Sequence, residues 1–158
     1  MDVEVVRSPR RRKTVEARQV GDVLRVSIPA TMTPEEEAHW VERMRRRFER
    51  RRRSTDIELP ARARSLAERL GLPYPEMIRW VENQRRRWGS CTPTTGTIRL
   101  STRLAEYPQW VVDYVIVHEL AHLVEPYHDA AFWSLVSRYP RTERARGFLI
   151  AKGLEPDE

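Results

Sequence analysis

Residues 117–128, VHELAHLVEPYH, place three of the chain's four histidines within eleven positions. His118 and His122 are four residues apart, so on a helix they share one face and can present two imidazole nitrogens to one point. Zinc binds such nitrogens at about 2.0–2.1 Å in tetrahedral sites, and a catalytic site keeps one of its four positions for water. The stretch therefore predicts a helix that carries part of a metal site.

Glu119 directly follows the first of these histidines and completes a His-Glu-x-x-His motif. A carboxylate at this position can act as general base toward a water molecule that the metal polarises. We therefore predict Glu119 as the catalytic residue of a hydrolase that uses one zinc ion per chain.

Two residues compete to be the third metal ligand. Glu125 lies three positions after His122 and would share its face if the helix continued, but Pro126 disfavours helical geometry at the residue before it. His128 lies beyond the proline, where Asp129 can cap a new helix, and its offset of ten from His118 equals that of longer three-histidine motifs. Those motifs carry glycine where Glu125 stands, so the turn must differ. We predict His128 as the third ligand.

The composition is that of a globular protein, with 158 residues, 40% hydrophobic and 33% charged. We predict a single domain over residues 1–158, with a β-rich part at about 1–30 and a catalytic part at about 76–153. The basic start has no apolar segment after it, so no signal peptide is expected, and the apolar runs are too short for a membrane span. The single cysteine, Cys91, cannot form an internal disulfide, which favours a cytoplasmic location.

The net charge of +6 comes from a basic set of 27 Arg and 2 Lys. The densest cluster, at residues 45–53, ends a segment that reads as one amphipathic helix from about 34 to 53. Thr33 and Glu36 form a capping box there, and Ala38, Val41, Met44 and Phe48 form an apolar stripe. We interpret the arginines as a solvated helix end that complements the helix dipole. Any nucleic-acid affinity should then be weak and fall steeply with salt.

The remaining pattern predicts an α+β fold. Three β-rich segments, VEVVRS, KTVEARQV and VLRVSIP, precede the basic helix, and a second helix is expected from Pro60 to Gly71. A strand at about 77–85 should form a hairpin with a second strand at 97–101. Helices should follow at about 108–126, after Asp129, and up to Gly153.

Four segments, RWGSC, GTIRLS, DYVIVHELAHL and YHDAAFW, occur in an order and spacing that resemble the YgjP-like family of metal-dependent hydrolases. This family is of the zincin type and is distantly similar to the SprT-like and WLM metallopeptidases. The resemblance covers nearly the whole chain and implies His118, His122 and His128 as ligands and Glu119 as the catalytic carboxylate. Ser101 and Tyr127 stand where family members often carry asparagine.

The resemblance also implies that a strand beside the active helix holds extended substrate, and the strand at 77–85 or the one at 97–101 is the candidate. We expect Trp88 to pack in the core, Gly89 to allow a close backbone approach, and Cys91 to be a buried thiol rather than a fourth ligand. Four candidates remain open for stabilising the developing oxyanion: Tyr127, Tyr139, Arg99 and Arg103. Four carboxylates could orient the imidazoles: Asp113, Glu125, Asp129 and Glu143.

The most direct interpretation is a zinc metallopeptidase that acts on peptides or proteins. One alternative is a metal-dependent hydrolase of nucleotide phosphoanhydrides, because the same site can activate water and arginines can hold phosphate. The chain lacks a glycine-rich phosphate loop, which weakens this alternative. The other is a basic nucleic-acid-associated module with a structural metal, although a structural site has no use for Glu119.

Overall fold

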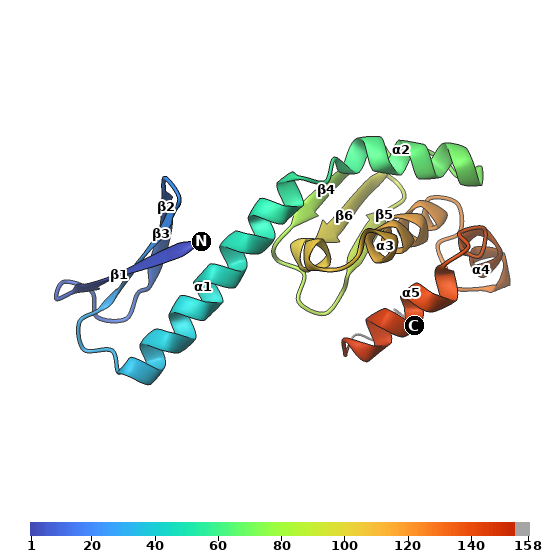
Figure 1. Ribbon diagram of the computed structural model, residues 1–158. Helices are drawn as coiled ribbons and strands as arrows, with labels where there is room; N and C mark the ends of the chain where they lie inside the picture. The colour runs from blue at the N-terminus through green and yellow to red at the C-terminus, as the bar shows by residue number, and fades with distance from the viewer. Residues whose placement is uncertain (154–158) are drawn as a thin grey trace. The chain divides into compact units, whose positions relative to one another are not determined.

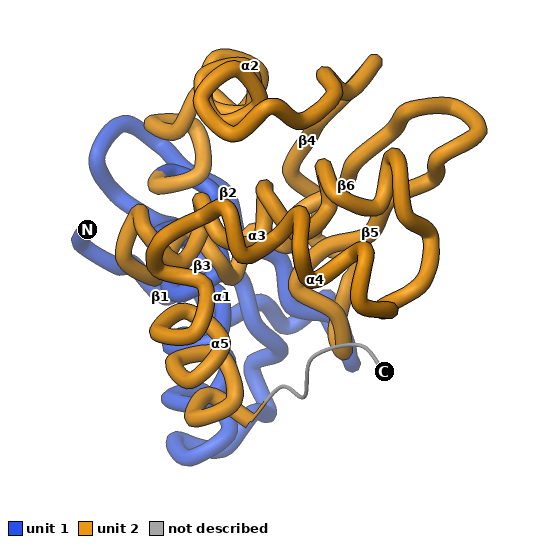
Figure 2. The backbone as a smooth tube through the Cα atoms, turned by 90° about the vertical axis from the view of Figure 1, so that its right-hand side faces the viewer, with its two compact units in different colours: residues 1–52 blue, residues 53–158 orange. Residues whose placement is uncertain are grey.

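A computed structural model describes residues 1–153, and the chain divides into two compact units, Met1–Arg52 and Arg53–Glu158. Figure 1 shows the helices and strands, and Figure 2 colours the two units. The described residues form two three-stranded sheets together with five α-helices and one short 3₁₀ helix. This mixture confirms the predicted α+β class. The single domain over residues 1–158 stays a prediction.

The sheet of the first unit consists of β1 (Asp2–Ser8), β2 (Glu16–Val20) and β3 (Val23–Pro29) in the order β1-β3-β2. β3 pairs parallel with β1 and antiparallel with β2, and Gly21 takes a positive φ of 61° in the tight turn between β2 and β3. Since β3 is central, its inward side chains are fully buried: Leu24, Val26 and Ile28.

Helix α1 (Pro34–Thr55) begins at the predicted capping box. The Glu36 backbone N–H donates to the Thr33 hydroxyl at 3.2 Å, and the Thr33 N–H donates to the Glu36 carboxylate at 2.9 Å. These two bonds satisfy N–H groups that a helix start would otherwise leave unpaired.

The apolar stripe of α1 is shorter than predicted. Val41, Met44 and Phe48 pack against the buried residues of β3, but Ala38 is exposed. In the first turn of the helix, Arg7 of β1 pairs with Glu37. The stripe therefore starts one turn later than its spacing indicated, and an ion pair anchors the first turn.

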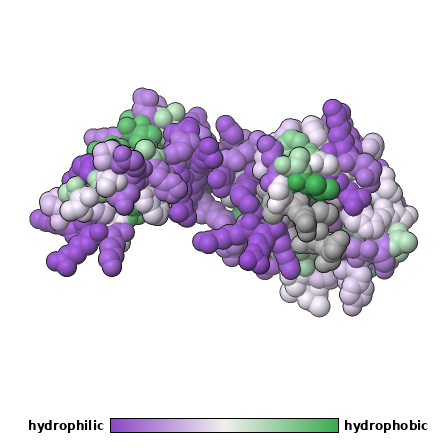
Figure 3. Space-filling model, turned by 90° about the horizontal axis from the view of Figure 1, so that it is seen from below, coloured by the Kyte–Doolittle hydropathy of each residue, from purple (hydrophilic) through white to green (hydrophobic). Residues whose placement is uncertain are grey.

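Hydrophilic residues cover most of the face that Figure 3 shows. Among the described helices, none combines the length and the apolar character needed to cross a membrane.

The sheet of the second unit consists of β4 (Met77–Val81), β5 (Gly89–Thr92) and β6 (Thr97–Ser101) in the order β4-β6-β5. The hairpin prediction was right about the turn but wrong about its first strand. β6 forms the hairpin with β5, whereas β4 ends at Val81 and pairs parallel with β6. Residues 82–88 form a loop between β4 and β5. A local pattern cannot report a parallel pairing, because the partner strand lies far along the chain.

In the second unit, α2, α3 and a short 3₁₀ helix contact this sheet, and two further helices contact α3. α2 (Leu59–Leu70) ends at Gly71, as predicted, and Gly71 takes the left-handed conformation with φ 65°. The 3₁₀ helix η1 (Thr102–Glu106) follows β6 and leads to α3 (Gln109–His122). α4 (Ala130–Val136) and α5 (Thr142–Ala151) complete the described chain.

Two helix ends differ from the predictions. α3 ends at His122 rather than at Pro126, because a proline disfavours helical geometry before it and the last turn tightens, with the Leu123 N–H donating to Leu120 O at 3.1 Å. α5 ends at Ala151, two residues before the predicted Gly153.

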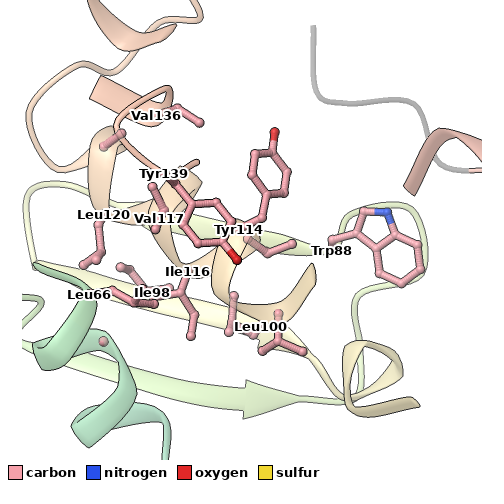
Figure 4. Close-up of a cluster of buried hydrophobic side chains, with 14 of the residues drawn as sticks. Leu66, Trp88, Ile98, Leu100, Tyr114, Ile116, Val117, Leu120, Val136 and Tyr139 are labelled. Atoms are coloured by element: carbon pink, nitrogen blue, oxygen red, sulfur yellow. The ribbon is translucent and has the colours of Figure 1, made fainter. Parts of the chain in front are cut away.

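The core of the second unit is centred on α3. Every residue from Val111 to Ala121 is buried, and the helix contacts α2, α4, α5, η1 and two strands of the sheet. A helix that is apolar all round is typical of a helix packed on every side. Figure 4 shows its side chains Ile116 and Leu120 among residues from α2 and β6, such as Leu66 and Leu100.

One buried charge ties α2 to α3. The Asp113 carboxylate on α3 is 5% exposed and accepts hydrogen bonds from the Arg62 guanidinium of α2, with Nε at 2.7 Å, and from the Gln109 amide at 2.9 Å. Asp113 and Arg62 also form a salt bridge, and the hydrogen bonds to the Asp113 carboxylate raise the pKa of Arg62. Asp113 therefore has a structural role.

Replacing Arg62 by Met should destabilise the protein by about 1–3 kcal/mol, because it leaves the buried Asp113 carboxylate without its cation. Arg64→Met is the matched control, since Arg64 is exposed on the same helix and its loss should change the free energy of unfolding by less than about 0.5 kcal/mol. Urea unfolding of both variants measures the difference. Equal stability of the two variants would contradict the structural role.

Candidate metal centre

α3 presents His118, Glu119 and His122 from its last turns. His118 is 7% exposed and Glu119 is 3% exposed, so both polar side chains lie within the apolar core of the second unit. The four-residue spacing brings the His118 and His122 rings to a centroid distance of 4.9 Å. The two histidines therefore share one face, as the motif predicted.

The third histidine reaches the same point from the loop after α3. His128 directly precedes Asp129, whose carboxylate caps α4 by accepting the Phe132 N–H at 2.9 Å, as predicted. This cap fixes where the loop enters α4. The His128 Nε2 atom lies 3.0 Å from His122 Nε2 and 3.2 Å from His118 Nε2.

This arrangement fits a metal ion. Within the described residues, His118, His122 and His128 form a group whose ligand atoms all lie within 4.8 Å of one another. In a tetrahedral zinc site the nitrogens are about 3.3 Å apart, close to the distances found here. Three converging nitrogen lone pairs repel one another, and a shared cation would relieve that repulsion. Glu125 does not belong to this group.

Burial keeps the first ligand candidate neutral. Desolvation, and then the neighbouring His122 and His128, lower the pKa of His118 from 6.5 to about 3. A neutral imidazole is the form that binds a metal.

Two oxygen-bearing groups orient the imidazoles of His118 and His122 by facing their Nδ1 atoms. The backbone carbonyl of Glu125 lies 3.0 Å from His122 Nδ1, and the Tyr114 hydroxyl lies 3.4 Å from His118 Nδ1. An Nδ1–H that donates to such an oxygen leaves Nε2 with its lone pair free for a metal. Burial raises the pKa of Tyr114, so its hydroxyl stays neutral.

Sequence reasoning looked for carboxylates in this role and missed both groups. Asp113 pairs with Arg62, Asp129 caps α4, and Glu143 pairs with Arg146, while Glu125 contributes its backbone rather than its side chain. Tyr114 could have been found, because it lies one helical turn before His118.

Phe132 packs against all three imidazoles. It is fully buried, stacks on His122 at a centroid distance of 4.4 Å, and meets the edges of His118 and His128 at 4.9 Å each. Since Phe132 lies on α4, the Asp129 cap at the start of this helix fixes the positions of both His128 and the Phe132 ring that packs on the three imidazoles.

The carboxylate of Glu119 lies against Gly89 of β5. A Cβ atom at Gly89 would come within 3.1 Å of Glu119 Oε1 and within 3.0 Å of a Leu100 methyl group. This confirms the predicted close backbone approach, since another side chain would displace the carboxylate. The neighbouring Trp88 is 9% exposed and belongs to the core, also as predicted.

A cavity of about 450 Å³ opens beside His122, His128 and Glu119. Its lining includes the following residues of the loop before β5, of β5 itself and of the loop after α3: Arg87, Ser90, Cys91 and Tyr127. Cys91 is half-buried, and burial together with Glu119 raises the pKa of its thiol to about 12. A neutral thiol is a poor metal ligand, which agrees with the predicted non-ligand role.

Of the four oxyanion candidates, Tyr127 alone is among the residues that line this cavity. The Tyr139 hydroxyl donates to the Trp110 carbonyl at 2.8 Å, and Arg103 binds backbone carbonyls of the loop 82–88. Arg99 lies 3.4 Å from the Thr92 hydroxyl. Arg87, which was not among these candidates, also lines the cavity.

The expected substrate strand must be corrected. β6 (97–101) is central and paired on both sides, and β4 (77–81) forms the opposite edge, so the strand that lines the cavity is β5. The Ser101 N–H donates to Trp88 O at 2.9 Å, which fixes the alternation of the β5–β6 ladder. Gly89 and Cys91 therefore direct their backbone groups away from β6, toward the open edge.

Residues 8–150 match the family described as YgjP-like, metallopeptidase domain. The chain belongs to the YgjP-like metallopeptidase family. This confirms the resemblance noted from the sequence and identifies the YgjP-like chain as a metal-dependent peptidase by family.

Among solved structures, this YgjP-like chain is similar to the metallopeptidase zymogen of Pyrococcus abyssi abylysin. The TM-score is 0.56 at 21% sequence identity, over 63% of this chain and 100% of the other. At this identity the likeness concerns the fold. No curated protein matches the chain.

Replacing His128 by Ala should lower zinc affinity by orders of magnitude, since it removes one of three converging nitrogens. Glu125→Ala should retain one zinc per chain, because alanine keeps the backbone carbonyl that faces His122. Titration of both proteins against a competing chelator measures the two affinities. Loss of the metal in Glu125→Ala with retention in His128→Ala would show that the ligand assignment is wrong.

Proposed function

We propose that this chain is a zinc-dependent peptidase in which His118, His122 and His128 hold the ion and Glu119 is the general base. The observation that carries the proposal is the convergence of three imidazole nitrogens beside a buried carboxylate at the wall of an open cavity. A purely structural metal site would be closed. The family match supports the choice of peptide bonds as the target.

When bound, zinc would polarise the scissile carbonyl and lower the pKa of a water molecule. Glu119 accepts a proton from the attacking water, whose oxygen bonds to the carbonyl carbon. The C–N bond then breaks, and Glu119 returns the proton to the leaving amine. Water is thereby divided between the two products, a carboxylic acid and an amine, the acid then loses its proton to the amine or to solvent, and Glu119 ends in its starting state.

The chain around Glu119 supports this role. Its carboxylate lies at the Gly89 backbone of β5, so a peptide that extends along the open edge of β5 would bring its carbonyl near the same carboxylate. Main-chain pairing with Gly89 and Cys91 would give affinity without demanding particular side chains. Tyr127 is 76% exposed at the cavity and is the best-placed of the predicted donors for the developing oxyanion.

A nucleotide phosphoanhydride substrate is less well supported. A triphosphate is usually held by several cationic or backbone donors, whereas one arginine of residues 1–153, Arg87, lines this cavity. An extended peptide, in contrast, matches the edge strand.

Glu119→Gln should keep the fold and one zinc per chain but reduce peptide hydrolysis about 10²–10⁴-fold, because an amide cannot accept the proton. Glu68→Gln is the matched control, since Glu68 is exposed on α2 and accepts the Tyr74 hydroxyl away from the cavity. Cleavage of a diverse peptide library, with metal content measured in parallel, tests the proposal. A Glu119→Gln protein with most of its activity would refute the base, and nucleotide turnover without peptide cleavage would refute the peptidase.

A further inference from the structure

The third proposed ligand is oriented differently from the other two. Among residues 1–153, protein oxygen atoms face the Nδ1 atoms of His118 and His122 but not that of His128. The Tyr114 hydroxyl and the Glu125 carbonyl supply the first two contacts. The ring-nitrogen contacts of His128 are made through Nε2, to the other two histidines. Within the described protein, the plane of the third imidazole is therefore set by the rings that pack against it.

The indole of Trp133 is the ring most nearly parallel to His128. The two ring centroids are 6.0 Å apart and the ring planes differ by 29°, whereas Phe132 meets the same imidazole edge-on at 78°. Stacked and edge-on contacts are both favourable arrangements of aromatic rings. Two rings that contact one imidazole at such different angles restrict its rotation, and Trp133 supplies the contact that restricts its plane.

Arg146 of α5 holds the Trp133 ring. Its guanidinium carbon lies 4.2 Å from the ring centroid, the shortest cation–ring distance among the described residues. The Nε–H of Arg146 is buried without a hydrogen-bond acceptor in residues 1–153, so the face of the indole offsets its desolvation. The ion pair of Arg146 with Glu143 contributes little, because the Glu143 side chain is 84% exposed.

These contacts connect the third ligand to the helix that carries the other two. α5 packs against α3, which carries His118 and His122. His128 lies on the separate loop after α3, so its position relative to that helix is not set by helix geometry. Arg146 and Trp133 carry the position of α5 over to this loop.

We infer that Trp133 is a positioning residue for His128 and that Arg146 positions Trp133 in turn. This inference rests on the metal site of the proposed function. It adds to that site two residues that are not among those lining the cavity.

Trp133→Leu should lower zinc affinity about 10–100-fold, the range typical of groups that orient a metal ligand. Trp133→Phe keeps an aromatic face and should restore most of the loss. Trp110→Leu is the matched control, because this half-buried indole has Arg144 of α5 over its ring at 5.4 Å. Trp110 lies at the other end of α3 from the histidines, so its loss should keep zinc affinity within about twofold.

Competition with a chelator measures zinc affinity, and urea unfolding measures the stability of the metal-free proteins. The visible absorption of the cobalt(II) forms is a third measurement, since it responds to the number and arrangement of the ligands. We expect Trp133→Leu to change this spectrum and Trp110→Leu to preserve it. Wild-type zinc affinity in Trp133→Leu, or equal losses of affinity in both leucine variants, would overturn the inference.

Arg146→Gln separates positioning from simple electrostatics. Removing a positive charge near zinc should tighten zinc binding by Coulomb's law, whereas losing the contact that holds Trp133 should weaken it. We expect zinc affinity to fall about two- to tenfold, and Arg146→Lys, which keeps a cation over the ring, should lose less. Glu143→Gln is the control that removes the exposed ion pair alone and should keep zinc affinity within about twofold. Tighter zinc binding in Arg146→Gln would overturn the role of Arg146.

Peptide cleavage separates the failure of this inference from the failure of the proposed function. If the unmodified protein binds zinc but cleaves no peptide, and the Trp133 variants behave as expected, the peptidase proposal fails and the positioning inference stands. If His128→Ala loses zinc while Trp133→Leu retains it with wild-type affinity, the metal site stands and the positioning inference is wrong.

Discussion

The site depends on the burial of α3 on every side. Eleven successive residues of this helix, Val111 to Ala121, are buried, and they include the ionisable His118 and Glu119. A buried polar group is stable only with partners, so each one restricts the elements around it. Tyr114 faces His118 from within the helix, while α4 and β5 supply the other neighbours. The elements around α3 therefore have to pack against every face of this helix, because none of its faces can be left exposed to solvent.

The position at which α3 ends allows the three histidines to converge. If the helix had continued to Pro126, His128 would have been carried away from the other two histidines. The stop at His122 lets the chain fold back, and the freed Glu125 carbonyl then meets His122 Nδ1 at 3.0 Å. This carbonyl, which lies beyond the helix end, thereby selects the tautomer that His122 needs as the proposed ligand. Helix termination and ligand orientation are therefore one structural event.

Local chemistry could be predicted from the sequence because its partners lie within a few residues. The capping box at Thr33, the cap at Asp129 and the helix end at Gly71 all involve neighbours along the chain, and each prediction was correct. The spacing of His118, Glu119 and His122 is likewise a property of a single helix. These features supplied the candidate site and the order of the helices.

Features that depend on distant partners could not be predicted in this way. The parallel pairing of β4 with β6 and the short β5 were missed, because four residues with Gly89 and Ser90 at their start carry little strand propensity. Arg103 was considered only as a donor to substrate, since nothing local indicates that a loop some eighteen residues earlier receives its guanidinium. Because the chain contains many arginines, its composition does not single out Arg103 as the arginine that holds a loop in place.

Gly89 shows why these distant contacts matter for chemistry. It begins β5, follows the buried Trp88 beside Arg103, and leaves room for the Glu119 carboxylate at 3.1 Å from where its Cβ would be. In the proposed peptidase, a side chain at this position would move the Glu119 carboxylate away from a substrate carbonyl held at β5, and a misplacement of about 1 Å can cost 10²-fold in rate. In the proposed peptidase, the loop that Arg103 holds would therefore bear on catalysis, because this loop leads directly into β5.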